Sequence, residues 1–321
     1  MEHLKNYIKH GELRSDNTLH VIGVIENPMR YQSRYRIFQQ WYKAMLATPN
    51  VKVYIVECSY GDRHFEVTDP NNPQHLQLYS TQPIWHKENL INLGVEKLFP
   101  SDWKYMSWCD CDVFFNKTDW ALETIHRMQD YCVVQSWSDC LDLGFNGRVL
   151  QHFKSFCYQH QLGVPKQTHP SQPYQYAHTG YQFAYRRDFW EAVGGLIDFC
   201  ILGSCDHHTA FALINEVDKT IHNGMTKDFF KGWDDWEFKA YRHTNGQLGY
   251  VPGFITHSFH GKKVNRQYRE RWQILIDDNF DPLTNLCHDT QGLIKVIGNP
   301  KLLEDCRTYM RERQEDSIDE Y

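Results

Sequence analysis

Hydrophobic and polar positions in the first half of the chain follow two alternating periods. Residues 19–25 and 51–57 form apolar or alternating runs that are typical of buried strands, whereas apolar residues within 32–47 recur every three or four positions, as in an amphipathic helix. The pattern goes on to predict a strand at 75–80, a helix at 84–98, a strand at 103–109, a helix at 119–130 and a strand at 131–136. This alternation predicts an α/β fold with a parallel, doubly wound sheet, which binds ligands where its strands end.

The second half of the chain is less regular. Residues 250–260 are predicted to form a short strand that leads into a loop, and helices are predicted near 148–161, 204–217, 227–243, 264–277 and 300–314. There is no linker, low-complexity run or internal repeat, so we expect one continuous domain. Its predicted parts are a nucleotide-sugar-binding half at 1–145, an acceptor half at 146–285 and a helical tail at 286–321, whose last residues, 315–321, are polar and expected to fray.

Composition narrows the class of protein. Of 321 residues, 41% are hydrophobic and 23% are charged, which excludes global disorder, and a net charge of −6 argues against a broadly basic nucleic-acid coat. No apolar run approaches the roughly 18 residues of a transmembrane helix, and the N-terminus has no signal-peptide segment. The ten cysteines include no CxxC pair. We therefore expect reduced thiols in a cytoplasmic protein, with no obligate protein partner evident.

Two acids stand directly after the predicted strand at 103–109. Asp110 and Asp112 are separated by one residue, so together they present carboxylate oxygens at the edge of the sheet. Mg²⁺ and Mn²⁺ prefer such oxygens and can bridge to a diphosphate. A solvated turn explains the same pair, so the pair alone leaves both readings open.

A second candidate segment follows the predicted strand near residue 255. His257 or His260 could complete a metal shell begun by the carboxylates, since imidazole suits Mn²⁺. Lys262 and Lys263 could meet phosphate oxygens, and Gly261 would let the backbone approach a ligand closely. The alternative is a surface loop whose histidines are satisfied by the protein.

Three further segments carry candidate groups. Asp206 opens a predicted helix, where it is either a general base or an ordinary first-turn acid. Arg30 and Arg34 follow the first strand, where a helix N-terminus also favours phosphate, although a capping turn with solvated arginines fits as well. Lys87 and Asn92 lie on the helix at 84–98, either as nucleotide contacts or as ordinary surface groups.

In order and spacing, these segments resemble the GT-A glycosyltransferases, especially the β-1,4-galactosyltransferase branch, and also uncharacterised bacterial and bacteriophage glycosyltransferases. The resemblance covers roughly residues 20 to 270. The segments similar to the family's nucleotide loop, "FNRAKLLNVG" helix, "FSDVDL" metal strand, "GGVSAL…F…ING" stretch, "GGED" motif and "IRHSRDKK" loop are, in turn, 24–34, 84–94, 107–115, 180–196, 203–206 and 255–263.

The resemblance implies a GT-A, Rossmann-like fold: a mostly parallel twisted sheet flanked by helices, with an irregular C-terminal acceptor half. It implies transfer of a hexosyl or pentosyl group from a nucleotide-sugar, with a UDP-sugar favoured, and a requirement for Mn²⁺ or Mg²⁺. Asp112 would be the direct metal ligand, Asp110 would support the metal or the donor ribose, and His257, or His260 as the alternative, would be the histidine ligand. Asp206 would be the general base of an inverting transfer. The diphosphate contacts would come from Arg30, Arg34 and Lys87.

Departures from the family pattern bear on the metal and the acceptor. The family's methionine ligand is Phe254 here, so the metal shell must differ. The acids that hold N-acetylglucosamine in the family are replaced by Cys205, His207 and His208, so we expect another acceptor. A His-x-x-x-Gly-x-Lys spacing also resembles retaining GT-A enzymes. An acceptor glycan, hydroxymethylated DNA or a merely solvated face are all compatible with a basic cluster formed by Lys262, Lys263, Arg266, Arg269 and Arg271.

Two rival functions remain open. The pair Asp110 and Asp112, followed later by Asp206 and His208, is similar to the pattern of DHH-family phosphodiesterases, in which two metals support hydrolysis. This reading leaves the segments near Arg34 and Lys87 unexplained. A non-catalytic nucleotide- or sugar-binding protein is the second rival, and it would saturate with ligand without turnover.

Overall fold

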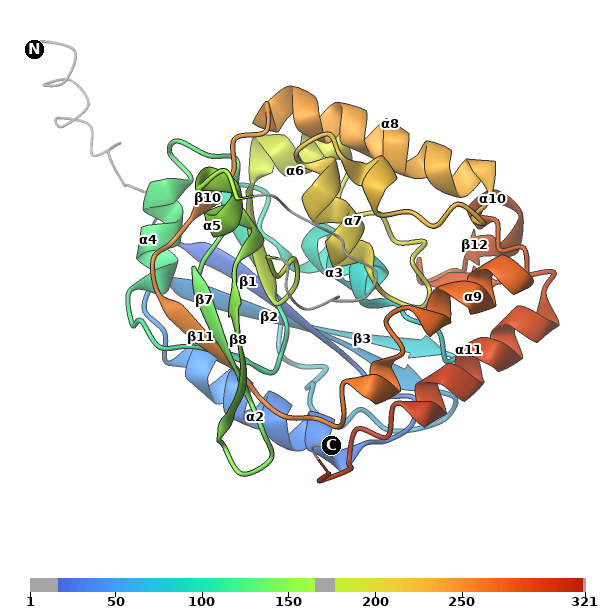
Figure 1. The fold of residues 1–321 in the computed structure, drawn as a ribbon. Helices are drawn as coiled ribbons and strands as arrows, with labels where there is room; N and C mark the ends of the chain where they lie inside the picture. The colour runs from blue at the N-terminus through green and yellow to red at the C-terminus, as the bar shows by residue number, and fades with distance from the viewer. Residues whose placement is uncertain (1–16, 165–176, 320–321) are drawn as a thin grey trace, which may run out of the picture.

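The central feature of the computed structural model, which describes residues 17–164 and 177–319, is a seven-stranded sheet. The polar N-terminus up to residue 16 and the last two residues lie outside the described part. The strand order is β10-β6-β9-β4-β1-β2-β3, and all neighbouring strands are parallel except β9, which is antiparallel to both β4 and β6. The neighbouring strands β1, β2 and β3 can be followed in Figure 1. The strands are β1 (Leu19–Glu26), β2 (Val51–Tyr60), β3 (His75–Ser80), β4 (Tyr105–Cys109), β6 (Val133–Gln135), β9 (Gln182–Arg186) and β10 (Gly249–Tyr250).

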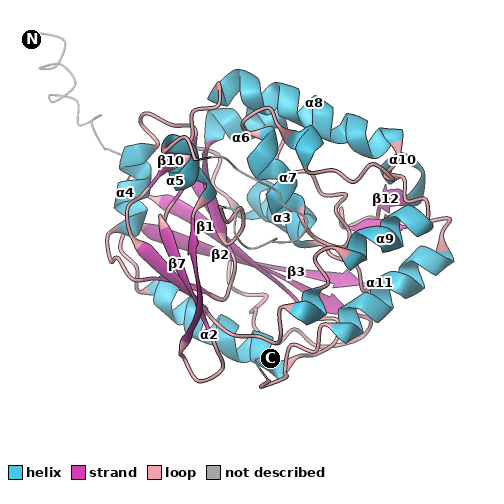
Figure 2. Cartoon of the chain, viewed as in Figure 1, coloured by secondary structure: helices cyan, strands magenta, loops and turns pink. Residues whose placement is uncertain are grey.

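Helices cover both faces of this sheet (Figure 2). Successive side chains of a strand point to opposite faces, so Val21 of β1 joins one core with Trp41, while Ile22 joins a second core with Leu90. The first core takes in α2 (Gln32–Leu46) and α4 (Trp120–Arg127). The second takes in α3 (Lys87–Leu98), α6 (Arg187–Val193), α7 (Cys205–Ala212) and α8 (Lys227–Thr244). This mixed α/β architecture, with a mainly parallel central sheet flanked by helices, confirms the predicted fold class.

A smaller sheet brings together segments that are far apart in the sequence. Its order is β5-β11-β7-β8, with β11 antiparallel to β5 and parallel to β7. In this register His257 lies opposite Val113 on one side and Asp142 on the other. The strands are β5 (Val113–Phe115), β7 (Asp139–Leu143), β8 (Val149–Lys154) and β11 (Phe254–His257).

The described chain contains further elements outside the two larger sheets and the helices named so far. No helix among the described residues combines the length and apolar character needed to cross a membrane. The predicted division into halves at residue 145 crosses the central sheet, which takes β9 and β10 from the second half. The other elements are α5 (Phe156–Gln161), α9 (Glu270–Asp277), α10 (Pro282–Asn285), α11 (Pro300–Glu312), β12 (Leu286–His288), β13 (Ile294–Val296) and two 3₁₀ turns at Val217–Lys219 and Val264–Arg266.

Two predicted helices differ from the structure. The first part of 148–161 is the strand β8, which pairs with β7, and α5 begins only after Ser155, whose hydroxyl accepts a hydrogen bond from the Tyr158 amide. Pairing with a neighbouring strand thus overrides the local pattern. The predicted helix at 264–277 is interrupted, because Gln267 has a φ of 46° and α9 begins only at Glu270.

The prediction that residues 315–321 fray is wrong where the chain meets helix α2. Glu315 is 1% exposed, and Asp316 accepts hydrogen bonds from the backbone amides of Gln32 and Ser33 at 2.9 and 2.7 Å. These amides are free donors of the first turn of α2, so the acid satisfies them and pins the C-terminal segment to the helix. The predicted helical tail at 286–321 also contains the small β12–β13 sheet besides helix α11.

Candidate metal centre and cavity

A cavity of about 600 Å³ lies where β1 and β4 end. This is the edge at which doubly wound sheets bind ligands. Its wall includes residues 24–26, 110–112, 178–181 and 219–223, with further side chains from 203–207 and from 257–272. The predicted site residues that line it are Arg34, Lys87, Asp110, Asp112, Asp206, His257, His260 and Lys263.

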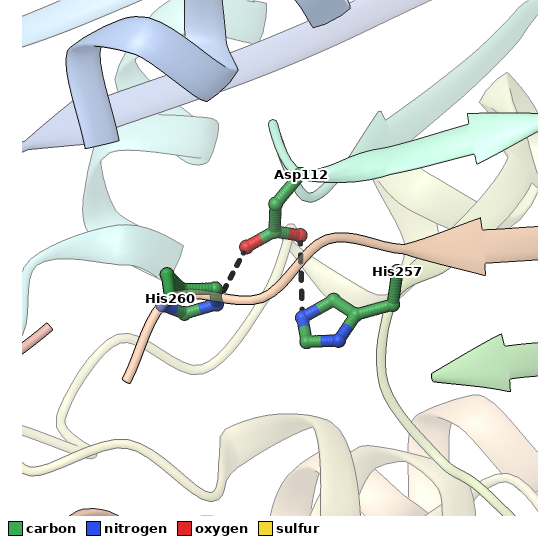
Figure 3. Close-up of side chains that lie close together, drawn as sticks. All are labelled: Asp112, His257 and His260. Atoms are coloured by element: carbon green, nitrogen blue, oxygen red, sulfur yellow. Dashed lines mark ion pairs between the residues drawn. The ribbon is translucent and has the colours of Figure 1, made fainter. Parts of the chain in front are cut away.

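Three side chains converge at one side of this cavity (Figure 3). One potential ligand atom from each of Asp112, His257 and His260 lies within 4.8 Å of the others. His260 Nε2 lies 3.0 Å from Asp112 Oδ2, and His257 Nε2 lies 3.7 Å from Asp112 Oδ1. The pairing of β5 with β11 explains this meeting, since it continues in a hydrogen bond from the Ser258 amide to the Asp112 carbonyl at 2.9 Å. Both of the alternative histidines lie in this group.

The two histidines beside Asp112 hold its carboxyl group in the charged form. Burial by itself would raise the pKa of Asp112, but His257 and His260 outweigh it and hold that pKa well below its usual value. Burial would lower the pKa of His257, yet Asp112 and Asp142 raise it to about 10. Asp112 Oδ1 is buried without a hydrogen-bond partner. An unsatisfied carboxylate oxygen beside two imidazoles is a donor set that fits Mn²⁺.

Each histidine of the group is backed by a buried acid. His257 Nδ1 pairs with Asp142 Oδ1, and His260 Nδ1 lies 3.5 Å from Glu315 Oε2. Such carboxylate–imidazole pairs orient metal-binding histidines in proteins. Arg266 Nη2 also lies 2.9 Å from His260 Nε2, and its cation therefore borders the same ring. Sequence reasoning missed both acids, because Asp142 lies within a strand and belongs to no recognised motif, and Glu315 lies in a polar tail.

Arg34 lines the cavity with three of its five N–H donors already engaged. Its Nη2 donates to Glu315 Oε1 at 2.8 Å, its Nε also donates to Glu315, and its Nη1 donates to the Glu26 carbonyl at 3.0 Å. The predicted role of Arg34 as a diphosphate contact therefore has a competitor within the chain. Gly261, with a φ of 85°, lies against the same segment, where a Cβ would stand 2.9 Å from the Gln314 carbonyl oxygen. Its close approach is to this segment, whereas the sequence suggested a ligand.

Three predicted nucleotide contacts lie outside the cavity. Arg30 forms an exposed ion pair on the surface. The Asn92 amide is used within the fold, where it accepts from the Leu196 amide at 2.9 Å and donates to the Leu196 carbonyl at 2.8 Å. Lys262 lies 3.6 Å from Asp319. Motif position placed these residues near the nucleotide, but their side chains are engaged elsewhere, and we no longer propose them as nucleotide contacts.

Asp110 reaches the cavity but not the metal group. Its carboxylate pairs with Lys87, whose Nζ also lies 4.2 Å from the centre of the Trp108 ring. The neighbouring Glu88 is 6% exposed and lines the same wall. Burial, reinforced by the charge of Asp206 and opposed by Lys87, raises the pKa of Glu88 to about 8. Glu88 is therefore mainly protonated at neutral pH.

The lining also contains Asp206, at the start of α7. A Cβ at Gly180 would overlap Asp206 Oδ2, so this glycine lets the carboxylate rest against the backbone of the 178–181 segment. No ion pair joins Asp206 to another residue of the described chain. Beside it, His178 stacks on Tyr181 with ring centres 3.8 Å apart. Burial lowers the pKa of His178 to about 3, so this aromatic pair is uncharged at neutral pH.

Comparisons with known proteins find similarity only among solved structures. No family model and no curated protein matches the chain. It is similar to the Staphylococcus aureus TarS fragment 1–349 at 10% identity and a TM-score of 0.41, over 81% of this chain and 64% of that one. The chain thus spans less than two thirds of the TarS fragment.

Two further solved structures are similar at comparable levels. The mannosyltransferase PcManGT of Pyrobaculum calidifontis, in complex with GDP-Man and Mn²⁺, matches at 12% identity and a TM-score of 0.42, over 84% of this chain and 67% of that one. A mutant of Drosophila β-1,4-galactosyltransferase 7, in complex with manganese, UDP-Gal and xylobiose, matches at 12% identity and a TM-score of 0.40, over 90% and 98%. By their names, both of these proteins are sugar transferases.

Proposed function

We propose that this protein is a metal-dependent glycosyltransferase that moves a sugar from a nucleotide-sugar, with a UDP-sugar favoured, to an acceptor hydroxyl. The convergence of Asp112, His257 and His260 on the cavity that Asp206 also lines carries the proposal. Those three side chains would hold Mn²⁺ or Mg²⁺. The chemistry that such an ion supplies when bound is stabilisation of the negative charge on the diphosphate leaving group.

The chain's own residues supply the proton transfer and further positive charge. In an inverting reaction, the acceptor oxygen bonds to the anomeric carbon while the bond from that carbon to the diphosphate oxygen breaks. The hydroxyl proton then passes to a carboxylate, and Asp206 is our candidate because no described cation pairs with it. Glu88 is the weaker candidate, since its raised pKa keeps it protonated at neutral pH. Lys263 and Arg266 line the cavity beside the metal group, where they would favour the diphosphate.

Release of nucleotide from candidate donors tests this function without knowledge of the acceptor. We would incubate the protein with UDP-, GDP-, CMP- and dTDP-sugars and Mn²⁺ and measure the nucleotide that slow hydrolysis releases. We expect one nucleotide class to be hydrolysed, with EDTA stopping the reaction and Mn²⁺ restoring it. Absence of release from every donor by the folded protein, or release that EDTA does not affect, would contradict the proposal.

The acceptor is proposed to be a glycan or another hydroxyl compound, and hydroxymethylated DNA is no longer proposed. Three of the five basic residues that suggested a DNA backbone have separate partners within the chain. Lys262 lies near Asp319, Lys263 pairs with Asp142, and Arg266 contacts His260. A backbone-binding face needs several cations exposed together to the phosphates.

The rival phosphoesterase has less support from the geometry. It needs the histidine pair after Asp206 to reach a second metal, but His208 is fully buried and its Nδ1 lies 2.6 Å from Thr220 Oγ1. Among the described residues, Asp112, His257 and His260 form the single group of potential metal ligands. Hydrolysis of bis-p-nitrophenyl phosphate, faster than that of any nucleotide-sugar, would favour the rival.

A further inference from the structure

Arg271 is a buried cation beside the loop that precedes Asp206. Its side chain lines the cavity, although the residue is only 6% exposed. Nη2 donates to Ser204 Oγ, and Nη1 donates to the Tyr309 hydroxyl at 3.2 Å. The guanidinium also stands close to the Gly203 backbone, where a Cβ would lie 3.0 Å from Nη1. Ser204 and Tyr309 therefore hold this cation in one place.

The charge of Arg271 has no counter-ion within the described chain. No carboxylate of residues 17–164 or 177–319 pairs with it, and the charge of Asp206 acts on it without an ion pair. A guanidinium carries five N–H donors, and the two hydrogen bonds use two of them. Its Nε is buried without a hydrogen-bond partner. Because a buried charge normally has an ionic partner, Arg271 is a cation prepared for an anion that enters the cavity.

Arg271 contacts the loop that leads into the proposed base. Arg266, five positions earlier in the sequence, contacts His260 of the metal group, whereas Arg271 contacts Ser204, two residues before Asp206. A general base must lie within hydrogen-bond reach of the acceptor hydroxyl. A group bound by Arg271 therefore belongs to the molecule that meets Asp206.

We propose that Arg271 binds an anionic group of the acceptor, a phosphate or a carboxylate, and so selects acidic acceptors; this inference rests on the proposed function. A guanidinium matches both groups through two parallel N–H donors. Lys219 and Arg269 line the cavity as well and add positive charge, although Lys219 also pairs with Glu216 at 2.9 Å. Asp206, the proposed base, lines the same cavity.

Binding of matched sugars tests the inference. Glucose, glucose 6-phosphate and glucuronate would be titrated into the protein by calorimetry, with and without UDP and Mn²⁺. We expect one of the anionic sugars to bind at least about tenfold more tightly than glucose, and to do so in the presence of UDP and Mn²⁺. Equal binding of all three sugars would overturn the inference. Loss of the preference for the anionic sugars when UDP and Mn²⁺ are present would also overturn it, because Arg271 would then not bind the acceptor.

The variants Arg271→Gln and Arg242→Gln make the test specific. Arg242 is an exposed arginine of α8 outside the cavity, so the same chemical change there should leave the preference intact. Arg271→Gln should abolish it; retention of the preference would refute the inference. If Arg271→Gln does not fold, phenylglyoxal labelling of the wild-type protein replaces it, and the anionic sugar should shield Arg271 but not Arg242. Anionic binding without nucleotide-sugar turnover would reject the proposed function alone, and turnover without an anionic preference would reject this inference alone.

Discussion

Two groups of side chains line the cavity and differ in how their charges are balanced. We call them the metal end (Asp112 and its two histidines) and the unpaired end (Asp206 and Arg271). At the metal end, Asp112 faces two imidazoles, and each imidazole is backed by a buried acid, Asp142 or Glu315. At the other end, Asp206 and Arg271 line the cavity without an ion pair to any residue of the described chain. The first arrangement fixes the orientation of the imidazole rings before a ligand binds. The second leaves two charged groups whose partners a bound substrate would supply.

This difference assigns separate tasks to the two ends. Buried charges that pair with one another hold a geometry, and breaking one pair destabilises the fold. Charges that face a cavity without a partner contribute to reaction or recognition instead. Substitutions at the metal end should therefore affect stability and metal affinity, whereas substitutions at the other end should affect turnover and acceptor choice.

The largest expected effect is on turnover at the unpaired end. Asp206→Asn keeps the size of the side chain but removes the base, so we expect transfer to fall by about 10²–10⁴-fold. The fold and Mn²⁺ affinity should be retained. Asp228→Asn, at the first turn of α8, is the matched control and should transfer normally. Near-normal transfer by Asp206→Asn in steady-state kinetics would contradict the assignment of the base.

The next largest effect is on the free energy of unfolding, for a substitution at the metal end. Glu315→Gln leaves Arg34 and Arg313 without their buried acid, and Arg313 Nε lies only 2.6 Å from Glu315. We expect the free energy of unfolding to fall by about 3–5 kcal/mol in urea titrations. Glu304→Gln removes an exposed ion pair of α11 and should cost about 0–1 kcal/mol. Equal losses in the two variants would show that the C-terminal segment does not secure this end.

The contribution of Glu88 to the free energy of unfolding should depend on pH. Its pKa is raised from 4.5 to about 8, so it contributes stability fully below pH 4.5 and loses that contribution as the pH rises through 8. Glu88→Gln cannot ionise, and its stability relative to the wild type should therefore improve between pH 5 and 9. A few kcal/mol is expected, since one pKa unit corresponds to about 1.4 kcal/mol. A difference between the two proteins that stays constant over this range in chemical denaturation would contradict the burial of a neutral acid.

The smallest expected effect is on metal affinity. Asp142→Asn removes the charge that orients His257, so Mn²⁺ affinity measured by calorimetry should weaken by about 10–100-fold. Asp139, on the same strand, pairs with His152 at 2.8 Å on the surface. Asp139→Asn should therefore leave the affinity unchanged. Unaltered Mn²⁺ binding by Asp142→Asn would remove that acid from the account of the metal end.

The sequence predicted the fold where local patterns are sufficient. Strands β1 to β4 were predicted close to their observed bounds, and β1, which is buried on both faces, reads as an apolar run. The pattern missed β9 and assigned β8 to a helix. β9 is specified by β4 and β6, of which β4 is far away in the sequence, and β8 by its pairing with the preceding strand β7; the pattern of a single segment does not contain that information.

The candidate site divides in the same way. Motif order led to Asp112, His257 and His260, which the structure brings together. It did not lead to Asp142, which meets His257 only through the β7–β11 register. Nor did it lead to Glu315, because the sequence around it is polar and resembles a loose terminus. Motif spacing also does not specify which way a side chain faces, as Asn92 illustrates by bonding to Leu196 in the core.

The position of Mn²⁺ in a crystal grown with Mn²⁺ and UDP tests the central claim most directly. We predict an anomalous peak within bonding distance of Asp112, His257 and His260, and loss of that peak in the Asp112→Asn variant. A protein that hydrolyses nucleotide-sugars while its Mn²⁺ lies at other residues, or while no Mn²⁺ is bound, would contradict it.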